Sequence, residues 1–166
     1  TRKKYAKKGK PLSHQVWRNV DTALSSTRKL IRSANRSKKK IHVLHITTAE
    51  EIKLLLKNRK YVSFEVTPQH LILASPDCYK KLGTYAQMNP PIRGTRHRNV
   101  LRKTFQKGQI DIIGSDHAPH LKSEKNKIYP NSPSGMPGVQ TLLPILLNEV
   151  TKKTISLNEV VKLTSF

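Results

Sequence analysis

Hydrophobic residues along this chain follow two spacings that alternate with one another. Three short apolar runs rich in β-branched residues predict buried strands, and they cover residues 41–46, 61–66 and 110–115. Apolar residues three or four positions apart predict helices, and these cover residues 16–33, 47–56, 96–107, 139–150 and 154–166. Strands that alternate with helices are typical of parallel βα units, so the pattern predicts an α/β fold.

Local signals mark the borders of these elements. Two threonines followed closely by two glutamates, within residues 47–51, predict a capped helix start after the first strand. Residues 71–88 are mixed and predict a loop with one short helix, while residues 121–137, rich in proline and glycine, predict a loop that covers a site. Residues 1–11 lack a pattern and are expected to form a loop.

Two residues with metal-binding or acid–base chemistry stand at the exits of predicted strands. His45 is the last residue before the helix cap, and Asp116 follows the third strand. Strict alternation places His45 on the face of residues 41 and 43, and Asp116 on the face of residues 110, 112 and 114. On neighbouring parallel strands the pair suits metal ligation or proton transfer. From the residues alone, a hydrogen-bonded strand-end histidine and a surface loop rich in Asp and His stay open as alternatives.

Basic residues far outnumber acidic ones, and they are unevenly distributed. The chain holds 32 Lys and Arg against 10 Asp and Glu, a net charge of +22, and residues 1–40 carry 14 of the basic residues and one acid, Asp21. Such a surface attracts polyanions non-specifically. The basic run lacks interleaved aromatic residues and any helix-turn-helix or zinc-finger pattern, which favours a solvated lysine-rich face over a dedicated nucleic-acid-binding arm.

Length and cysteine content limit the class of protein further. A chain of 166 residues suits one domain. No apolar run approaches the roughly 20 residues of a membrane span, and the basic first residues do not resemble a signal peptide. The single cysteine, Cys78, excludes an internal disulfide and fits a reducing compartment, so we expect a cytoplasmic protein without a membrane partner.

The run Gly114-Ser115-Asp116-His117-Ala118-Pro119-His120 resembles a signature motif of the dihydroorotases, which are cyclic amidohydrolases of the metal-dependent amidohydrolase superfamily. Three further segments resemble the family in the right order: residues 42–48, 65–70 and 88–93. The second of these departs from the family pattern, because Gln69 stands where a histidine is usual. The resemblance implies that residues 1–166 are the C-terminal part of a (β/α)8 TIM-type barrel, about its last three βα units, with a basic segment at residues 1–15.

The resemblance also implies roles for individual residues. His45 and Asp116 would bind zinc, and Asp116 would also act as general base. Four residues match positions that contact substrate: Asn89, His120, Ser134 and Gly135. The implied reaction is the reversible hydrolysis of a cyclic amide, with dihydroorotate and N-carbamoyl-aspartate as the substrate pair, in pyrimidine biosynthesis.

Part of the family's metal site has no counterpart in this sequence. The family also uses a His-x-His motif, a bridging acid or carbamylated lysine, and a further histidine, whereas this chain has no His-x-His. His45 and Asp116 are two ligands where a catalytic zinc ion usually has three from the protein. We therefore expect the chain to be inactive, or nearly so, on its own.

Three functions stay open at this point. The chain is part of a dihydroorotase-type enzyme, with a separate N-terminal half as a candidate partner. Alternatively, it is a non-catalytic dihydroorotase-like subunit that binds another chain, for which aspartate carbamoyltransferase is the candidate. The third alternative is a basic nucleic-acid-binding protein, which the sequence supports only as non-specific attraction.

Overall fold

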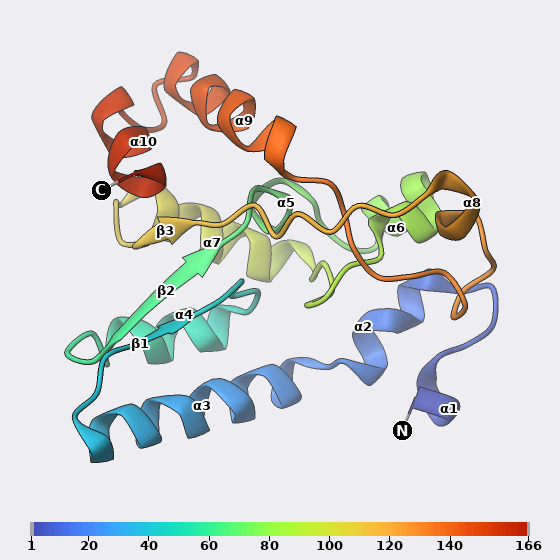
Figure 1. The fold of residues 1–166 in the computed structure, drawn as a ribbon, viewed down its shortest axis with the longest axis horizontal. Coiled ribbons are helices and arrows are strands. Elements are labelled where there is room, and N and C mark those ends of the chain that lie inside the picture. Colours follow the sequence, from blue (N-terminus) through green and yellow to red (C-terminus); the bar gives the residue numbers. More distant parts are fainter. Residues whose placement is uncertain (1, 166) are drawn as a thin grey trace.

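The computed structural model describes residues 2–165, and Figure 1 shows helices arranged around a small sheet. The strands are β1 (Ile41–Val43), β2 (Val62–Val66) and β3 (Ile112–Ile113). The α-helices are α1 (Arg2–Tyr5), α2 (His14–Trp17), α3 (Val20–Ser37), α4 (Ala49–Leu56), α5 (Pro68–Ile72), α6 (Asp77–Leu82), α7 (Thr95–Gln106), α8 (Lys122–Lys125), α9 (Val139–Thr151) and α10 (Leu157–Thr164). Two short 3-10 helices are η1 (Pro11–Ser13) and η2 (Gly83–Ala86).

The three strands pair in parallel in the order β1-β2-β3. Ile41 pairs with Val62, and Val66 pairs with Ile113. Parallel neighbours need crossover connections, which are α4 between β1 and β2, and α5 to α7 between β2 and β3 (Figure 1). The predicted α/β fold of parallel βα units is confirmed. The prediction that His45 and Asp116 leave neighbouring strands is wrong, because β2 lies between the two strands that they follow.

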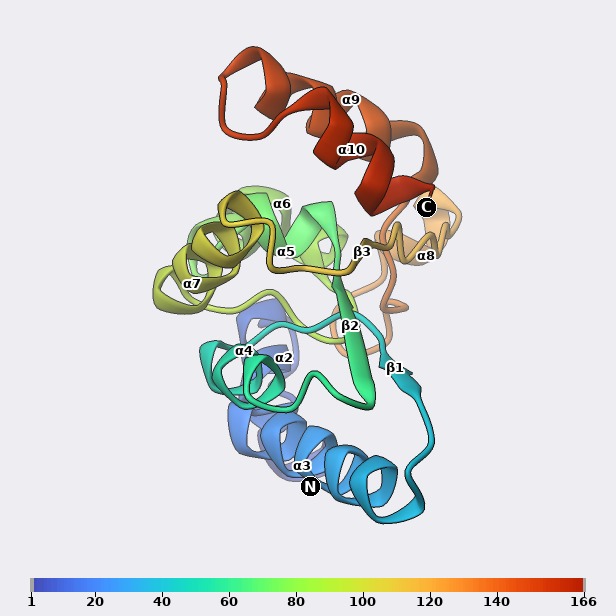
Figure 2. The same cartoon turned by 90° about the vertical axis from the view of Figure 1, so that its left-hand side faces the viewer.

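The hydrophobic core lies between the sheet and the helices on one of its faces. Val62, Phe64 and Val66 of β2 are at most 3% exposed, which confirms the alternation predicted for this strand. Figure 2 shows α4 and α7 on the same side of β2. Leu101 and Phe105 of α7 are buried in the same core, as their helical spacing predicted.

The other face of the sheet is more open. Leu44 is 55% exposed and Ile112 is 43% exposed, whereas Ile113 is buried. The sequence predicted a buried strand over residues 110–115 with residues 110, 112 and 114 on one face, and this is wrong because Ile112 is exposed while Ile110 is buried. Only residues 112–113 form a strand, and Ile110 is buried from the turn that precedes it, so a period of two does not extend back to residue 110.

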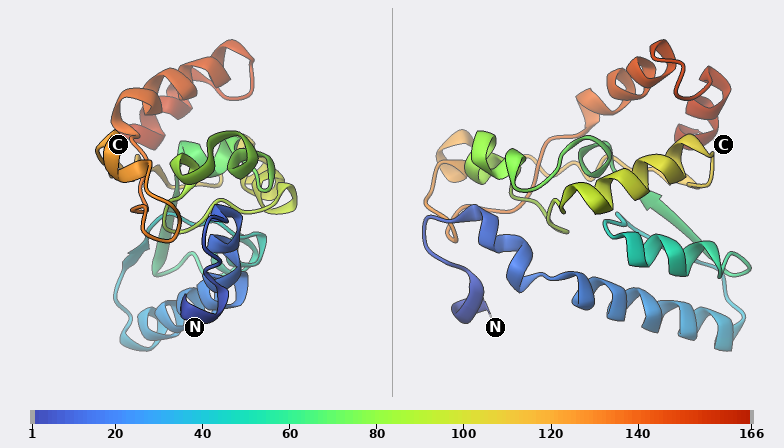
Figure 3. Two further views of the ribbon diagram at one scale, coloured as in Figure 1. Left: turned by 90° about the vertical axis from the view of Figure 1, so that its right-hand side faces the viewer. Right: turned by 180° about the vertical axis from the view of Figure 1, so that it is seen from behind.

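The first long predicted helix is in fact two helices. α2 ends at Trp17, and α3 begins after Asn19, whose Oδ1 accepts a hydrogen bond from the Thr22 backbone N–H at 2.9 Å. An asparagine N-cap satisfies one of the free N–H groups of the new helix and fixes its start. Figure 3 shows α2 turned away from the line of α3.

The predicted start of the helix after β1 is confirmed as a capping box. The Thr48 Oγ1 accepts from the Glu51 N–H at 3.1 Å, and the Glu51 Oε2 accepts from the Thr48 N–H at 3.1 Å. Glu51 is buried, and its Oε1 accepts from the Thr27 hydroxyl of α3 at 2.7 Å. The cap therefore also ties α3 to α4.

The stretches predicted as loops contain more helix than expected. Residues 1–11 include α1, residues 71–88 include α6 and η2, and residues 121–137 include α8. The ends of the chain, Thr1 in the predicted loop and Phe166 in the last predicted helix, lie outside the described residues. Within residues 2–165, no helix combines the length and the apolar character that crossing a membrane requires.

Candidate active site

His45 and Asp116 lie at the same end of the sheet, where the strands have their C-termini, and share an uncommon backbone conformation. They follow the C-terminal ends of the parallel strands β1 and β3, and their φ angles are 40° and 43°. The other two non-glycine residues with positive φ among residues 2–165 are Lys38 and Lys153, which follow the ends of helices α3 and α9. A left-handed conformation costs a non-glycine residue roughly 1–2 kcal/mol, and such strain is concentrated at functional sites.

Glu65 of β2 holds the turn in which His45 lies. Its Oε1 accepts from the His45 backbone N–H at 3.3 Å, and its Oε2 is 3.3 Å from the Nε2 of His42. The Glu65 carbonyl oxygen accepts from the Ile46 N–H at 2.9 Å. Sequence reasoning did not assign Glu65 a role, although a carboxylate among the apolar residues of a strand was a signal for one.

His70 fixes the loop that carries Asn89. Its ring is buried, with Nε2 3.0 Å from the Pro90 carbonyl oxygen and Nδ1 2.7 Å from the Thr67 hydroxyl. Burial lowers the pKa of His70 to about 3, so the ring is neutral at pH 7. The neutral ring donates from Nε2 to Pro90 and accepts from Thr67, and it joins the end of β2 to the Asn89 loop.

Gln69, which departs from the family pattern, supports the backbone next to Asp116. Its Nε2 donates to the Ser115 carbonyl oxygen at 3.2 Å. Its Oε1 is buried and has no hydrogen-bond partner among the described residues. The glycine at position 138 permits this packing, since a Cβ there would lie 3.0 Å from the Gln69 Nε2.

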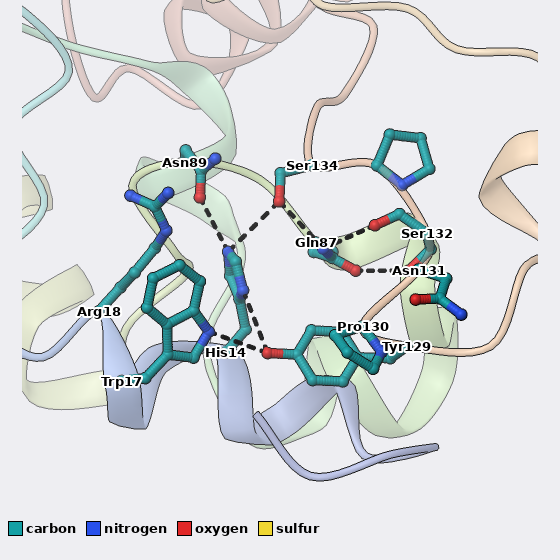
Figure 4. Close-up of a pocket in the computed structure, with 11 residues that line it drawn as sticks. His14, Trp17, Arg18, Gln87, Asn89, Tyr129, Pro130, Asn131, Ser132 and Ser134 are labelled. Carbon is teal, nitrogen blue, oxygen red and sulfur yellow. Dashed lines mark hydrogen bonds between the residues drawn. The ribbon is translucent and has the colours of Figure 1, made fainter. Parts of the chain in front are cut away.

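Asn89 and Ser134 line one cavity of about 480 Å³. Figure 4 shows its walls, which come from α2, from residues 87–89 and from residues 129–134. His14 of α2 lies between the two predicted substrate contacts, with Nε2 2.9 Å from the Asn89 Oδ1 and 3.5 Å from the Ser134 Oγ. Sequence reasoning missed His14, because its segment was noted only for its basic charge.

Asn89 also borders a second cavity, of about 310 Å³, that reaches His45. Arg18, on the segment between α2 and α3, lines both cavities. The structure therefore places Asn89 between the exit of β1 on one side and Ser134 on the other. This position joins one predicted metal ligand to two predicted substrate contacts.

The structure brings His120, Ser134 and Gly135 into direct contact. The His120 Nε2 donates to the Ser134 carbonyl oxygen at 3.2 Å. A Cβ on residue 135 would lie 2.8 Å from the same nitrogen, so the glycine is needed for this close approach. His120, Ser134 and Gly135 therefore form one contact group, here called the wall, of which Ser134 lines the cavity.

Lys125 holds this wall in place through hydrogen bonds to its backbone and to the neighbouring backbone. It is 4% exposed, and its Nζ donates to the carbonyl oxygens of Gln87, Pro133 and Gly135 at 3.2, 3.0 and 3.0 Å. Burial lowers its pKa to about 8, so at pH 7 three ammonium protons meet three acceptors. The loop predicted to cover a site is thus tightly bound at residues 132–135.

Two of the predicted residues, His45 and Asp116, have side chains of the types that bind zinc in proteins, an imidazole and a carboxylate. Among residues 2–165, however, no group of three or more His, Cys, Asp or Glu side chains is placed to hold a metal ion. The described part of the chain therefore offers two ligands, one fewer than a catalytic zinc site usually takes from its protein.

Comparison with solved structures identifies the fold. The chain superimposes on a D-hydantoinase with a TM-score of 0.84 at 22% sequence identity, covering 94% of this chain and 36% of that chain. A dihydroorotase from Saccharomyces cerevisiae in complex with 5-fluoroorotic acid gives a TM-score of 0.73 at 21% identity, covering 84% of this chain and 40% of that chain. The fold is thus part of an amidohydrolase (β/α) barrel, as the resemblance implied.

Sequence comparison points to one member of that class. The chain is 39% identical over 137 residues to the dihydroorotase of Methanosarcina mazei, which covers 76% of this chain and 30% of the relative. It spans about a third of the length of the curated relatives it matches. No protein-family model matches the chain. The chain is dihydroorotase-like, and the resemblance to a portion of these enzymes is confirmed.

Proposed function

We propose that this chain supplies two metal ligands and the substrate-binding loops of a dihydroorotase-type zinc hydrolase, which acts on a cyclic amide such as dihydroorotate. One observation carries the proposal. His45 and Asp116 follow two parallel strands at the same, C-terminal end of the sheet, and neither of their left-handed conformations terminates a helix. The similarity to dihydroorotases supports the choice of substrate.

The chemistry assigned to the chain's own residues is proton transfer and substrate orientation. The Asp116 carboxylate takes a proton from the attacking water and returns it to the leaving ring nitrogen. Asn89 and His120 hold the carboxylate and the ring of the substrate, and Ser134 and Gly135 contact the substrate beside them. Holding the reacting groups in place lowers the entropic part of the barrier.

Zinc fits the two ligands in kind, and when bound it would polarise the amide carbonyl and lower the pKa of water to about 7. His45 and Asp116 are the residues that would hold it. Because a third ligand is missing among the described residues, we expect the chain alone to show no measurable dihydroorotate turnover with added zinc.

A chimera tests the proposal. This chain replaces the matching segment of the Methanosarcina mazei dihydroorotase, and hydrolysis of dihydroorotate is measured with zinc present. We expect turnover, and we expect Asp116→Asn to reduce kcat by about 100-fold or more, the scale of general-base catalysis. Asp77→Asn, an exposed carboxylate on α6, is the matched control and should leave kcat unchanged. A folded chimera without turnover, or with full activity in Asp116→Asn, would contradict the proposal.

The exposed Leu44 and Ile112 favour a second candidate function, that of a non-catalytic subunit covered by a partner chain. The Asp116→Asn variant separates the two functions. A catalytic chain loses activity with this change, whereas a binding subunit keeps both its partner and the activity of that partner.

A further inference from the structure

His14 is a buried histidine that the proposed reaction does not use. It is 2% exposed, and its ring meets the rings of Trp17 and Tyr129 edge-on, with centroids 5.5 and 5.9 Å away. Its Nε2 is 2.9 Å from the Asn89 Oδ1 and 3.1 Å from the Met88 carbonyl oxygen. The two aromatic rings therefore hold the His14 ring in place, and its Nε2 faces the Asn89 side chain.

The surrounding donors and acceptors decide where the ring carries its proton. The Met88 carbonyl oxygen can only accept, so the His14 Nε2 donates. On the other side, the Trp17 Nε1 donates to the Tyr129 hydroxyl at 3.0 Å, which leaves that hydroxyl's own proton for the His14 Nδ1 at 3.5 Å. Burial lowers the pKa of His14 to about 4, so at pH 7 the ring is neutral and carries this single N–H.

The orientation of Asn89 follows from this arrangement. An N–H on the His14 Nε2 requires the amide oxygen of Asn89 on its side, as Figure 4 shows. The Asn89 amide nitrogen then lies on the side away from His14, and its N–H groups are donors to the space of the cavity. Without His14, a flip of the amide would present an acceptor there instead.

We propose that His14 is a positioning residue, which fixes the Asn89 amide so that its N–H groups face the ligand. The site then prefers a ligand that presents acceptor oxygens at this point, a carboxylate or an imide carbonyl, as dihydroorotate and N-carbamoyl-aspartate do. Arg18 adds positive charge to the same cavity, with its guanidinium 4.4 Å from the centre of the Trp17 ring. The choice of ligand rests on the proposed function, whereas the orientation of Asn89 rests only on the contacts of His14.

The orientation is tested first, by NMR on the 166-residue chain without ligand. Long-range ¹H–¹⁵N spectra at pH 7 should show His14 as the neutral Nε2–H tautomer. His14→Leu should shift the side-chain amide resonances of Asn89, and His14→Gln, which keeps an N–H donor, should restore them. His97→Leu is the control, because His97 accepts from the Ala49 backbone N–H and lies outside the residues that line the cavity. An Nδ1–H tautomer, or unchanged Asn89 resonances in a folded His14→Leu, would overturn the proposal.

Two further measurements keep the test decisive. If His14→Leu does not fold, Tyr129→Phe keeps the ring but removes the hydroxyl donor to Nδ1, and it should raise the population of the Nδ1–H tautomer.

Dihydroorotate is then titrated into the chimera, where we expect about tenfold weaker binding in His14→Leu and less than about threefold in His14→Gln, the scale of one hydrogen bond. Equal affinity in wild type and His14→Leu overturns the role of His14. No binding in any form counts against the proposed function instead, and the tautomer still decides the orientation.

Discussion

His45 and Asp116 hold a backbone conformation that neither side chain prefers. The cause for His45 is visible, since Glu65 accepts from its N–H and from the N–H of the next residue through its side chain and its backbone. For Asp116, Gln69 holds the carbonyl oxygen of the residue before it. Glu65 of β2 therefore supports the conformation of His45, and Gln69 of α5, the helix that follows β2, supports the backbone next to Asp116.

This strain predicts an unusual order of stability among variants at residue 116. Glycine adopts positive φ without a steric penalty, whereas alanine pays that penalty because it has a Cβ. We expect Asp116→Gly to be more stable than Asp116→Ala by about 1 kcal/mol in urea unfolding, although glycine is normally the weaker choice. The reverse order would show that the left-handed conformation of Asp116 is wrong.

The buried His14 predicts a pH dependence of stability. Burial lowers its pKa to about 4, and the facing charges of Arg18 and Arg93 act in the same direction, while the unfolded chain titrates near 6.5. Between these values the unfolded chain binds a proton that the folded chain does not, so the free energy of unfolding falls as pH drops from about 6.5 toward 4. Urea unfolding at pH 7 and pH 4.5 should show a smaller loss for His14→Gln than for wild type. Equal losses would exclude this role of His14, since other titrating groups are common to both chains.

At the scale of elements, local signals were readable from the sequence and distant contacts were not. The capped helix start within residues 47–51 was predicted correctly, and the structure shows that Thr48 and Glu51 form it. The break between α2 and α3 was missed because Val16 and Val20 continue a helical spacing, although Val16 is 53% exposed. The contact between His14 and Asn89 joins residues 75 positions apart, so no local sequence pattern could predict it.

The same limit explains which parts of the candidate site were predicted. Asn89, His120, Ser134 and Gly135 were named through motif resemblance, and the structure places Asn89 and Ser134 on one cavity and His120 against Ser134. Lys125 and Gln87, which hold that wall, were not predicted as such, because a lysine in a basic sequence suggests a solvated side chain. Its burial depends on three carbonyl oxygens that only the folded loop brings together.

The loop that carries Ser134 and Gly135 should loosen when Lys125 is replaced. Lys125→Met removes three donors from buried carbonyl oxygens, each of which is then unsatisfied. We expect hydrogen exchange of the Gly135 N–H, which donates to the Gln87 carbonyl oxygen at 2.9 Å, to accelerate by about tenfold or more. Lys127→Met, an exposed lysine two residues away, is the matched control and should leave this exchange unchanged. Equal protection in both variants would show that Lys125 does not hold the loop.

At the scale of the whole molecule, the chain combines an enzyme-like site with a strongly basic surface. The net charge is +22, and α3 carries four exposed basic residues, Arg28, Lys29, Arg32 and Arg36. The open face of the sheet, with Leu44 and Ile112, lies apart from the helix-covered core. The basic surface and the open face of the sheet could contact other molecules, but neither contains the residues assigned to the reaction.

The charge predicts DNA binding without sequence preference. Association driven by counterion release weakens steeply with salt. We expect affinity for a short DNA duplex to fall at least about tenfold between roughly 50 and 200 mM salt, and to be equal for duplexes of different sequence. Fluorescence anisotropy measures both. A defined site preference that survives at physiological salt would instead support a nucleic-acid-binding function.

The central claim is that His45 and Asp116 bind the same metal ion, and the zinc affinity of the chimera tests it most directly. Competition with a chelator gives the affinity of the wild-type chimera, of His45→Ala, of Asp116→Ala and of the double variant. We expect each single change to weaken zinc binding by about 100-fold or more, and the double change to weaken it by less than the product of the two, because ligands of one ion are coupled. Unchanged affinity in either single variant, or two losses that multiply independently, would contradict the claim.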